Sequence, residues 1–337
     1  MQLQKALKNV LACPSVSATL IGAPGVGKTQ ATAATLREAG YDVVLVSCQN
    51  LPVEDTAALP VVDKKSMTTK MTVPVRFALR PKVAFILDEL LKAPEDVVNA
   101  FLPLVHGREF MGQQFPLDTP VVITANSSEF KVGDALRPHI ANRVMQYEID
   151  DPTAAEAERV MLDLHYDSRI ISWTQKVPSA LVSFDPKMAE KPDTETDFYF
   201  GYRPRQPRQP FCSMRSLELA SSYLKAGITD AESLAGAIGV RAAKSLAAYT
   251  KEIGHRVDPA DILSGQAQVP PTLLDCRMAG VTAASMLDES NWQAVLTYVK
   301  RLPSEIQHLV ARQVALKKCC VVLSQKREFG SWVGGVL

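Results

Sequence analysis

One stretch of eight residues constrains the fold of this chain more than any other part of its sequence. Residues 22 to 29 read GAPGVGKT and fit the pattern G-x-x-x-x-G-K-[ST] at every constrained position. Glycines permit a tight turn whose backbone N–H groups point inward, and such a turn can surround phosphate groups. A β-rich run over 17–21 leads into the loop, and a helical pattern follows it as far as Gly40. The stretch therefore predicts a strand, a phosphate-binding loop and a helix in direct succession.

Each part of this loop has its own expected task. We expect Lys28 to reach the β- and γ-phosphate oxygens and the Thr29 hydroxyl to ligate Mg²⁺. The helix that begins near Lys28 adds the positive end of its dipole to the same anion site. The residues predicted to contact the nucleotide are Gly22, Ala23, Pro24, Gly25, Val26, Gly27, Lys28, Thr29 and Gln30. The sequence thus predicts a site for a nucleoside triphosphate with Mg²⁺.

Polar side chains follow two further apolar runs that read as buried parallel strands. Residues 83–87 lead into Asp88 and Glu89, and residues 120–125 lead into Asn126. Ligands of open α/β sheets bind at the carboxyl ends of the strands. We expect Asp88 to hold Mg²⁺ directly or through water, and Glu89 to orient and deprotonate an attacking water. Asn126 is suited to bind the γ-phosphate or that water, and a strand-end asparagine that caps a turn is the alternative.

Length and composition bound the architecture. With 337 residues the chain exceeds the usual size of a single core, and the pattern predicts an α/β nucleotide-binding domain over 1–150, a helical lid over 151–268 and a helical region over 269–337. The net charge of +1 argues against a polyelectrolyte partner for nucleic acid. We expect a cytoplasmic protein, because no secretion signal or membrane-length apolar run is present. The six cysteines and five histidines lack the spacing of metal ligands.

Three segments stand outside this regular pattern. The alternation over 67–75 predicts a hairpin within the irregular segment 51–80, and residues 107–115 predict a second hairpin that turns at Gly112. We expect both to be surface elements. The long loop near 185–211 contains the aromatic and arginine-rich segment 198–208, which suits either a single-stranded nucleic acid or a solvated loop.

Taken together, these motifs resemble those of the AAA+ ATPases, and more narrowly those of their MoxR-like or dynein-related (AAA_5-type) group. Residues 22–29 resemble the Walker A motif, residues 85–89 the Walker B motif, and Asn126 the residue called sensor 1. The run 136–143 resembles the segment that ends in an arginine finger, a role that falls on Arg143 with Arg137 as the alternative. Residues 213–217 resemble the start of the sensor 2 helix and place that role on Arg215. Two departures are Val144, where phenylalanine is common, and Met214, where proline is frequent.

This resemblance implies an α/β P-loop NTPase domain of the AAA+ type, with a three-layer parallel sheet, followed by an all-α lid and a C-terminal helical region. It implies Mg²⁺-dependent hydrolysis of ATP, with Thr29 and Asp88 at the metal and with catalytic roles for Lys28, Glu89, Asn126, Arg143 and Arg215. It also implies a homo-oligomeric, hexameric ring with a chaperone-like action on a client protein, with a von Willebrand factor A domain as a possible partner module and no membrane partner. Two alternatives are a nucleic-acid-stimulated motor or loader and a nucleotide-binding scaffold without turnover.

Overall fold

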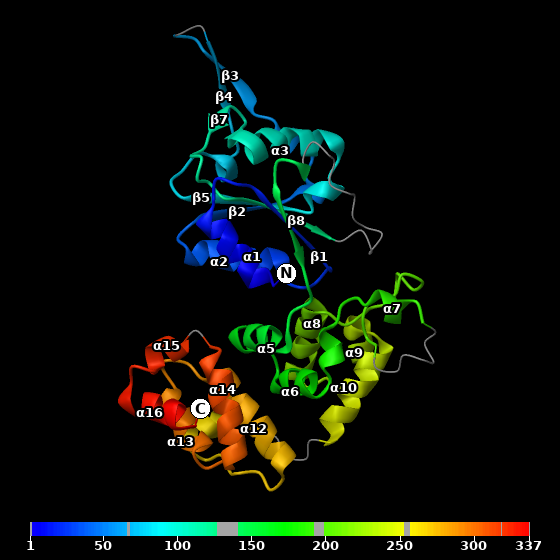
Figure 1. The fold of residues 1–337 in the computed structure, drawn as a ribbon, viewed down its shortest axis with the longest axis vertical. Coiled ribbons are helices and arrows are strands. Elements are labelled where there is room, and N and C mark those ends of the chain that lie inside the picture. Colours follow the sequence, from blue (N-terminus) through cyan, green and yellow to red (C-terminus); the bar gives the residue numbers. More distant parts are fainter. Residues whose placement is uncertain are drawn as a thin grey trace. The chain divides into compact units, whose positions relative to one another are not determined.

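The chain forms two compact units, which we describe separately. A computed structural model describes residues 2–65, 68–126, 141–191, 199–252, 257–317 and 319–336, and it divides into residues 1–151 and 152–337 (Figure 1). The further division near residue 268 remains a prediction. Within the described ranges, none of the helices combines the length and the apolar character that crossing a membrane requires.

A parallel five-stranded sheet forms the centre of the first unit. Its strand order is β2-β5-β8-β1-β9, and every pairing is parallel. Phe85, Ile86 and Ile123 in the central strands are completely buried, as expected for a sheet that is covered on both faces. The bounds are Ala18–Gly22 for β1, Asp42–Ser47 for β2, Val83–Asp88 for β5, Val121–Asn126 for β8 and Met145–Ile149 for β9.

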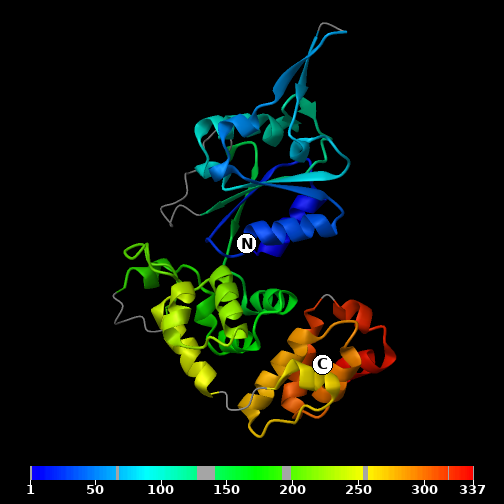
Figure 2. The same ribbon diagram turned by 180° about the vertical axis from the view of Figure 1, so that it is seen from behind.

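Three helices cover the two faces of this sheet. Helices α1 (Leu3–Ala12) and α2 (Lys28–Glu38) lie on one face, and α3 (Glu95–Gly107) lies on the other (Figures 1 and 2). Successive side chains of a strand point to opposite faces. Ile86 accordingly packs in a cluster with residues of α2, whereas Phe85 packs in a cluster with residues of α3. The three layers match the fold that the sequence predicts.

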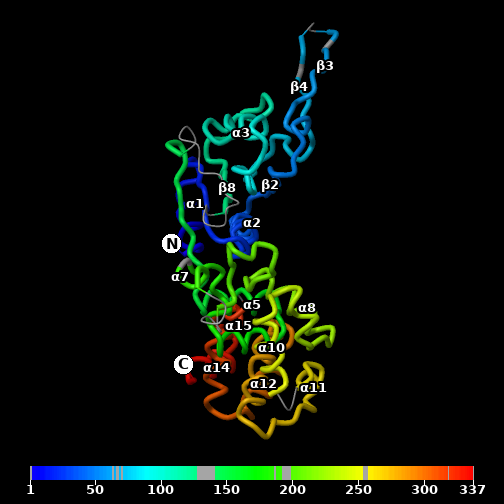
Figure 3. The backbone as a smooth tube through the Cα atoms, turned by 90° about the vertical axis from the view of Figure 1, so that its right-hand side faces the viewer, coloured from blue at the N-terminus to red at the C-terminus, as the bar shows by residue number. Residues whose placement is uncertain are grey.

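The predicted hairpin within 51–80 exists, but its first strand lies earlier than the alternating residues indicate. Strand β3 (Leu59–Asp63) pairs with β4 (Thr68–Thr72) in an antiparallel ribbon, which extends away from the sheet (Figure 3). Its apolar side chains are exposed, with Leu59 at 68% and Val62 at 63%. Short 3-10 turns flank the ribbon and follow β5, namely η1 (Cys48–Asn50), η2 (Val53–Thr56), η3 (Val75–Phe77) and η4 (Leu90–Lys92).

The second predicted hairpin forms as well, but its aromatic residues belong to the core. Strands β6 (Glu109–Phe110) and β7 (Gln113–Gln114) pair around the turn at Gly112, where φ is +73°. Phe110 is buried and stacks on Phe101, with 4.7 Å between the ring centroids. Phe115 is buried against Phe85. The expectation that this hairpin is a surface element is therefore wrong for both rings, because the tight turn returns the chain to the core.

The second unit is entirely helical in the part that the structure describes. One apolar cluster runs through it from Ala157 to Trp332, and it includes the fully buried Trp173. Helices α6 and α14 both pack against α12. The helices are α5 (Ala154–Asp163), α6 (Ser168–Lys176), η6 (Pro178–Leu181), α7 (Pro186–Ala189), α8 (Met214–Lys225), α9 (Ala231–Ile238), α10 (Val240–Glu252), α11 (Pro259–Ser264), α12 (Leu273–Met286), α13 (Trp292–Val299), α14 (Ser304–Ala315), α15 (Cys319–Leu323) and α16 (Arg327–Val336).

The aromatic residues before the arginine-rich loop are packing residues. Tyr199, Phe200 and Tyr202 are all buried. The Tyr199 hydroxyl donates to the Tyr202 carbonyl at 2.8 Å, and the Tyr202 ring packs edge-on against Phe211. These rings are therefore not a platform for stacking bases, which requires exposed faces. Phe198 lies outside the described residues.

A buried arginine ties together the amino ends of the strands in the first unit. Arg108 follows α3 with φ of +60°, its side chain is 1% exposed, and burial holds the pKa of its guanidinium below the usual value. Its guanidinium donates hydrogen bonds to the Ser17 hydroxyl oxygen and to four carbonyl oxygens, at 2.7 to 3.1 Å. These carbonyls belong to Pro14, Ser15, Val105 and Thr119. One side chain thus joins the segment before β1, the end of α3 and the segment before β8.

We predict that Arg108→Met lowers the free energy of unfolding by about 3 kcal/mol, because it leaves several buried acceptors without a donor. Urea unfolding followed by circular dichroism measures the change. Arg37→Met is the matched control, because Arg37 is exposed on α2, and it should cost less than about 0.5 kcal/mol. Equal losses in the two variants would contradict the anchoring role of Arg108.

Candidate phosphate and magnesium site

Two glycines give the loop after β1 its shape. Gly25 and Gly27 have φ of +84° and +87°, a region in which other residues are strained. Gly27 also serves as the N-cap of α2, whose first internal bond runs from the Ala31 amide to the Gly27 carbonyl at 2.9 Å. The amides of Thr29 and Gln30 precede that bond and have no carbonyl partner within the helix. The loop thus leads into α2, and the first backbone amides of this helix point toward its N-terminus. Such amides can bind an anion.

Gly22 is required for a different reason, which is close packing at the end of β1. It lies opposite Asn126 on one neighbouring strand and opposite Ile149 on the other. A Cβ atom at this position would stand 2.6 Å from the carbonyl oxygen of Ile149. A residue with a side chain would therefore push β9 away from the base of the loop.

Lys28 places its cation inside this loop. The side chain is only 6% exposed. Its Nζ donates to the carbonyls of Gly22 and Ala23 at 2.9 and 2.8 Å and to Asn126 Oδ1 at 3.4 Å. Neutral oxygens thus hold the Lys28 ammonium group at the loop. Charged phosphate oxygens can replace them, because their hydrogen bonds to an ammonium group are stronger.

Asp88 is held by hydroxyl groups from two other elements. Its Oδ1 accepts a hydrogen bond from Thr29 Oγ1 at 2.7 Å and another from Thr124 Oγ1, whose residue is its register partner on β8. Burial raises the pKa of the Cys48 thiol to about 12, and the negative charge of Asp88 adds to this increase.

The chemistry of this pair suits Mg²⁺, which prefers oxygen ligands and keeps several waters or phosphate oxygens. No group of three or more histidine, cysteine, aspartate or glutamate side chains suited to a metal occurs in the described part of the chain. Thr29 and Asp88 are therefore candidates to hold a metal that phosphates and water also ligate.

Glu89 stands beside Asp88 in an unusual backbone conformation. Its φ of +53° is left-handed, and its amide donates to the Thr124 carbonyl at 3.1 Å. Its Oε1 accepts from Asn126 Nδ2 and from Lys92 Nζ, both at 2.9 Å. Strained conformations of non-glycine residues often occur at functional sites. The carboxylate of Glu89 thus stands within hydrogen-bond distance of Asn126.

The sheet thus brings together Lys28, Thr29, Asp88, Glu89 and Asn126 at the carboxyl ends of β1, β5 and β8. Sequence reasoning did not identify two side chains that complete the cluster, Thr124 and Lys92. Thr124 lies two residues before Asn126, so the strand period places both on one face. Lys92 follows Glu89 by three residues in the turn η4, which is a spacing that indicates a local ion pair.

Arg143 is not brought to this cluster. It precedes β9, whose first residue, Met145, is in register with Ala18 at the start of β1. Arg143 therefore lies at the amino ends of the strands, on the edge opposite to the phosphate loop. Its exposed side chain contacts His106, with 3.0 Å between Nη1 and Nδ1. The alternative finger, Arg137, lies outside the described residues.

Arg215 belongs to the second unit. It is exposed in the first turn of α8, which begins after an N-cap formed by Ser213 and Ser216. A cation at a helix N-terminus faces the positive end of the dipole, which costs stability. This position is compatible with a functional reason for the arginine, and its sensor role remains a prediction.

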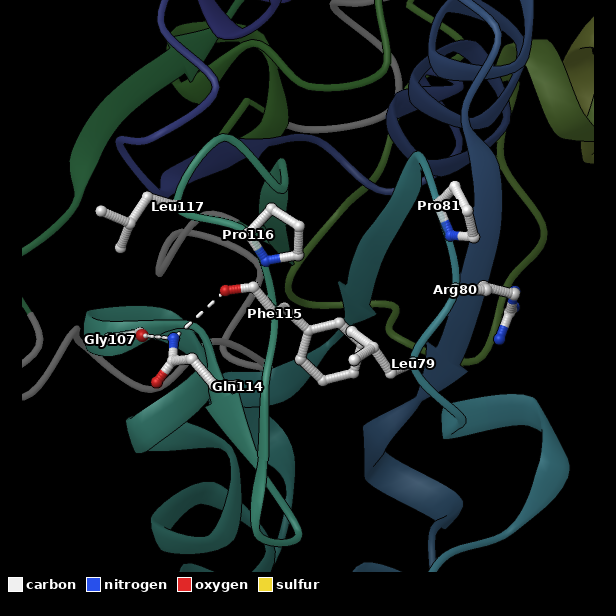
Figure 4. A pocket seen from close by; sticks show the side chains of 8 residues that line it. All are labelled: Leu79, Arg80, Pro81, Gly107, Gln114, Phe115, Pro116 and Leu117. Carbon is white, nitrogen blue, oxygen red and sulfur yellow. Dashed lines mark hydrogen bonds between the residues drawn. The ribbon is translucent and has the colours of Figure 1, made fainter.

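The first unit also has a cavity of about 870 Å³, which is not the phosphate site (Figure 4). It lies where the chain enters β5 and β8, and thus at the amino ends of the strands. The Gln114 amide closes part of its wall by donating to the Gly107 and Phe115 carbonyls. The lining is largely apolar, and its residues are Leu79, Arg80, Pro81, Gly107, Gln114, Phe115, Pro116 and Leu117.

Comparisons with known proteins find distant structural similarity alone. No protein-family profile and no curated protein matches the chain. Among solved structures, it is similar to a presumed ATPase from Cytophaga hutchinsonii, with 16% identity over 48% of this chain and 50% of that chain, and a TM-score of 0.37. It is also similar to the Holliday junction branch migration motor RuvB from Thermotoga maritima, with 14% identity over 78% and 74% of the two chains, and a TM-score of 0.36. The chain spans about half the length of the first of these proteins.

The chain's own topology defines its fold. The strand order is β2-β5-β8-β1-β9, the phosphate loop follows β1, and the acidic pair follows β5. A helical unit comes after this sheet. The chain has an α/β P-loop fold.

We predict that Gly22→Ala lowers the free energy of unfolding by about 1–3 kcal/mol, because its Cβ would meet the backbone of Ile149. Gly107→Ala is the matched control, since a Cβ there meets nothing within 4 Å and the residue ends α3. The control should be neutral or slightly stabilising. Chemical unfolding of both variants measures the difference, and a stable Gly22→Ala protein would contradict the packing argument.

Proposed function

We propose that this chain is a Mg²⁺-dependent ATPase that works as a ring-forming, MoxR-like AAA+ protein and remodels or activates a partner protein. The observation that carries the ATPase proposal is the convergence of Lys28, Thr29, Asp88, Glu89 and Asn126 at one edge of the sheet. Each of them contacts another member through a side-chain hydrogen bond. The Glu89 carboxylate within this cluster favours turnover over the alternative of a nucleotide-binding scaffold.

Binding comes first in the proposed reaction. Lys28 exchanges the Gly22 and Ala23 carbonyls for the β- and γ-phosphate oxygens, and the amides of the loop bind the remaining oxygens. Thr29 and Asp88 would hold Mg²⁺, which would neutralise charge on those oxygens.

Glu89 then acts on the attacking water. Both of its side-chain bonds are made by Oε1, and we assign to Oε2 the role of proton acceptor. Asn126 links this carboxylate to Lys28, because its amide accepts from one residue and donates to the other. The water would thus be oriented by the same residues that contact the γ-phosphate.

The proposed assembly of subunits is argued from Arg143, and the proposed contact with a partner protein from the β3–β4 ribbon. Arg143 lies at the edge opposite to its own phosphate loop, so it can serve only the site of another subunit. The ribbon exposes Leu59 and Val62 to solvent, and an apolar surface of this kind is typical of contact with another protein. A von Willebrand factor A domain remains the partner that the sequence resemblance implies. The nucleic-acid alternative is weaker, because Tyr199 and Tyr202 are buried.

We predict that Lys28→Ala abolishes ATP binding, whereas Glu89→Gln binds ATP and loses turnover by at least about 100-fold. The reason is that Lys28 serves the phosphates of the bound substrate, while Glu89 acts on the water. Calorimetry measures binding, and phosphate release measures turnover.

Lys8→Ala and Glu109→Gln are the matched controls for this pair, because both residues are exposed and lie outside the cluster. Both variants should bind and hydrolyse ATP as the unmodified chain does. Glu89→Gln that hydrolyses ATP at the unmodified rate would remove Glu89 from the mechanism.

We predict that subunits with Arg143→Ala and subunits with Lys28→Ala, each inactive alone, regain activity when mixed. In a mixed ring some intact Lys28 sites would face an intact Arg143, and such an arginine is worth roughly 10³–10⁵ in rate in related P-loop systems. Phosphate release measures recovery, and fluorescence transfer between labelled chains verifies subunit exchange. Confirmed exchange without recovery, together with full activity of an isolated monomer, would contradict the trans role.

A further inference from the structure

Lys92 is the charged side chain in the cluster to which the proposed function gives no task. It ends the turn η4 directly after β5, and its amide donates to the Glu89 carbonyl at 3.0 Å. Leu90, which lies between the two residues, is completely buried and fixes the turn to the core. The backbone thus holds Lys92 and Glu89 on one short, anchored turn.

The ion pair between these side chains is partly buried. Lys92 Nζ lies 2.9 Å from Glu89 Oε1, and the side chains are 14% and 32% exposed. Pairs with this degree of burial are screened less by water and salt than pairs on an open surface. Glu89 Oε1 also accepts from Asn126 Nδ2, so two donors on different elements fix the same carboxylate oxygen.

A bound triphosphate would make this arrangement necessary. The γ-phosphate carries negative charge, and Asp88 and Glu89 add two carboxylates to the same edge of the sheet. Repulsion between phosphate and Glu89 would favour movement of the carboxylate away from the attacking water. A cation that holds Oε1 from the side of the turn opposes this movement and leaves Oε2 in place.

We propose that Lys92 is a positioning residue for hydrolysis, which keeps the Glu89 carboxylate in place against the charge of the bound nucleotide. This inference rests on the proposed ATPase function. It implies that Lys92 acts through Glu89 and not on ATP directly. Removing it should therefore lower kcat and leave nucleotide affinity unchanged.

Lys92→Met removes the charge and keeps most of the side-chain length, so it is the main test variant. We expect kcat to fall about 10- to 100-fold, which is the usual cost of a misplaced catalytic group, while the Kd for ATP stays within about twofold. Lys92→Arg keeps a cation and should retain kcat within about fivefold. Lys8→Met, an exposed lysine of α1, is the matched control and should change neither quantity.

A double-mutant comparison separates positioning from other roles. In the Glu89→Gln background the carboxylate is gone, so adding Lys92→Met should lower the residual single-turnover rate by less than about twofold. A merely structural lysine would lower the rate by the same factor in both backgrounds. Thermal unfolding of every variant shows whether the fold is kept, and Lys92→Gln, which also removes the charge, replaces Lys92→Met if that variant does not fold.

An unchanged or raised kcat in Lys92→Met would overturn the proposal, and so would a full additional loss in the Glu89→Gln background. A raised Kd for ATP with unchanged kcat would overturn it too, because Lys92 would then be a binding residue. Absence of turnover in the unmodified chain would contradict the proposed ATPase function together with this inference. Turnover that Lys92→Met leaves intact would contradict only the role of Lys92.

Discussion

The parallel pairing of β5, β8 and β1 is the constraint on which the candidate site depends. It sets Asp88 opposite Thr124 and Gly22 opposite Asn126. Parallel strands end at the same edge, so groups far apart in the sequence meet there without any direct local interaction. The apolar interior of these strands maintains the register, because a slip of one residue would turn every buried side chain to the other face.

Charge at this edge is balanced by neighbours on different elements. The cations of Lys28 and Lys92 stand at the two ends of a short chain of contacts that passes through Asn126 and Glu89. Asp88 is fixed by hydroxyl groups instead of a cation. Donors and acceptors that are fixed by such a network reduce the reorganisation needed during a reaction.

The opposite edge of the sheet has a different chemistry. Arg108 is buried there among carbonyls, whereas Arg143 is exposed beside His106. A buried guanidinium that is fully hydrogen-bonded acts as a structural anchor, and an exposed one is available to another molecule. The first unit thus has an edge with the candidate phosphate site and an edge with these two arginines, separated by the length of its strands.

The sequence by itself determined the local features of the site. The glycines of the loop, Lys28, Asp88 with Glu89, and Asn126 were all predictable, because each follows an apolar strand or belongs to a short pattern of fixed spacing. The three layers of the sheet domain were predictable for the same reason. These features depend on neighbours in the chain, so the sequence contains nearly all the necessary information.

The tertiary structure decided what depends on packing between distant segments. It placed Phe110 and Tyr202 in the core, although their sequence neighbourhoods indicated exposed elements. It moved the first strand of the ribbon to Leu59–Asp63. It also assigned Thr124 to Asp88 and Lys92 to Glu89. Strand register and burial arise from the whole sheet, and a local pattern cannot show which partner a polar side chain will meet.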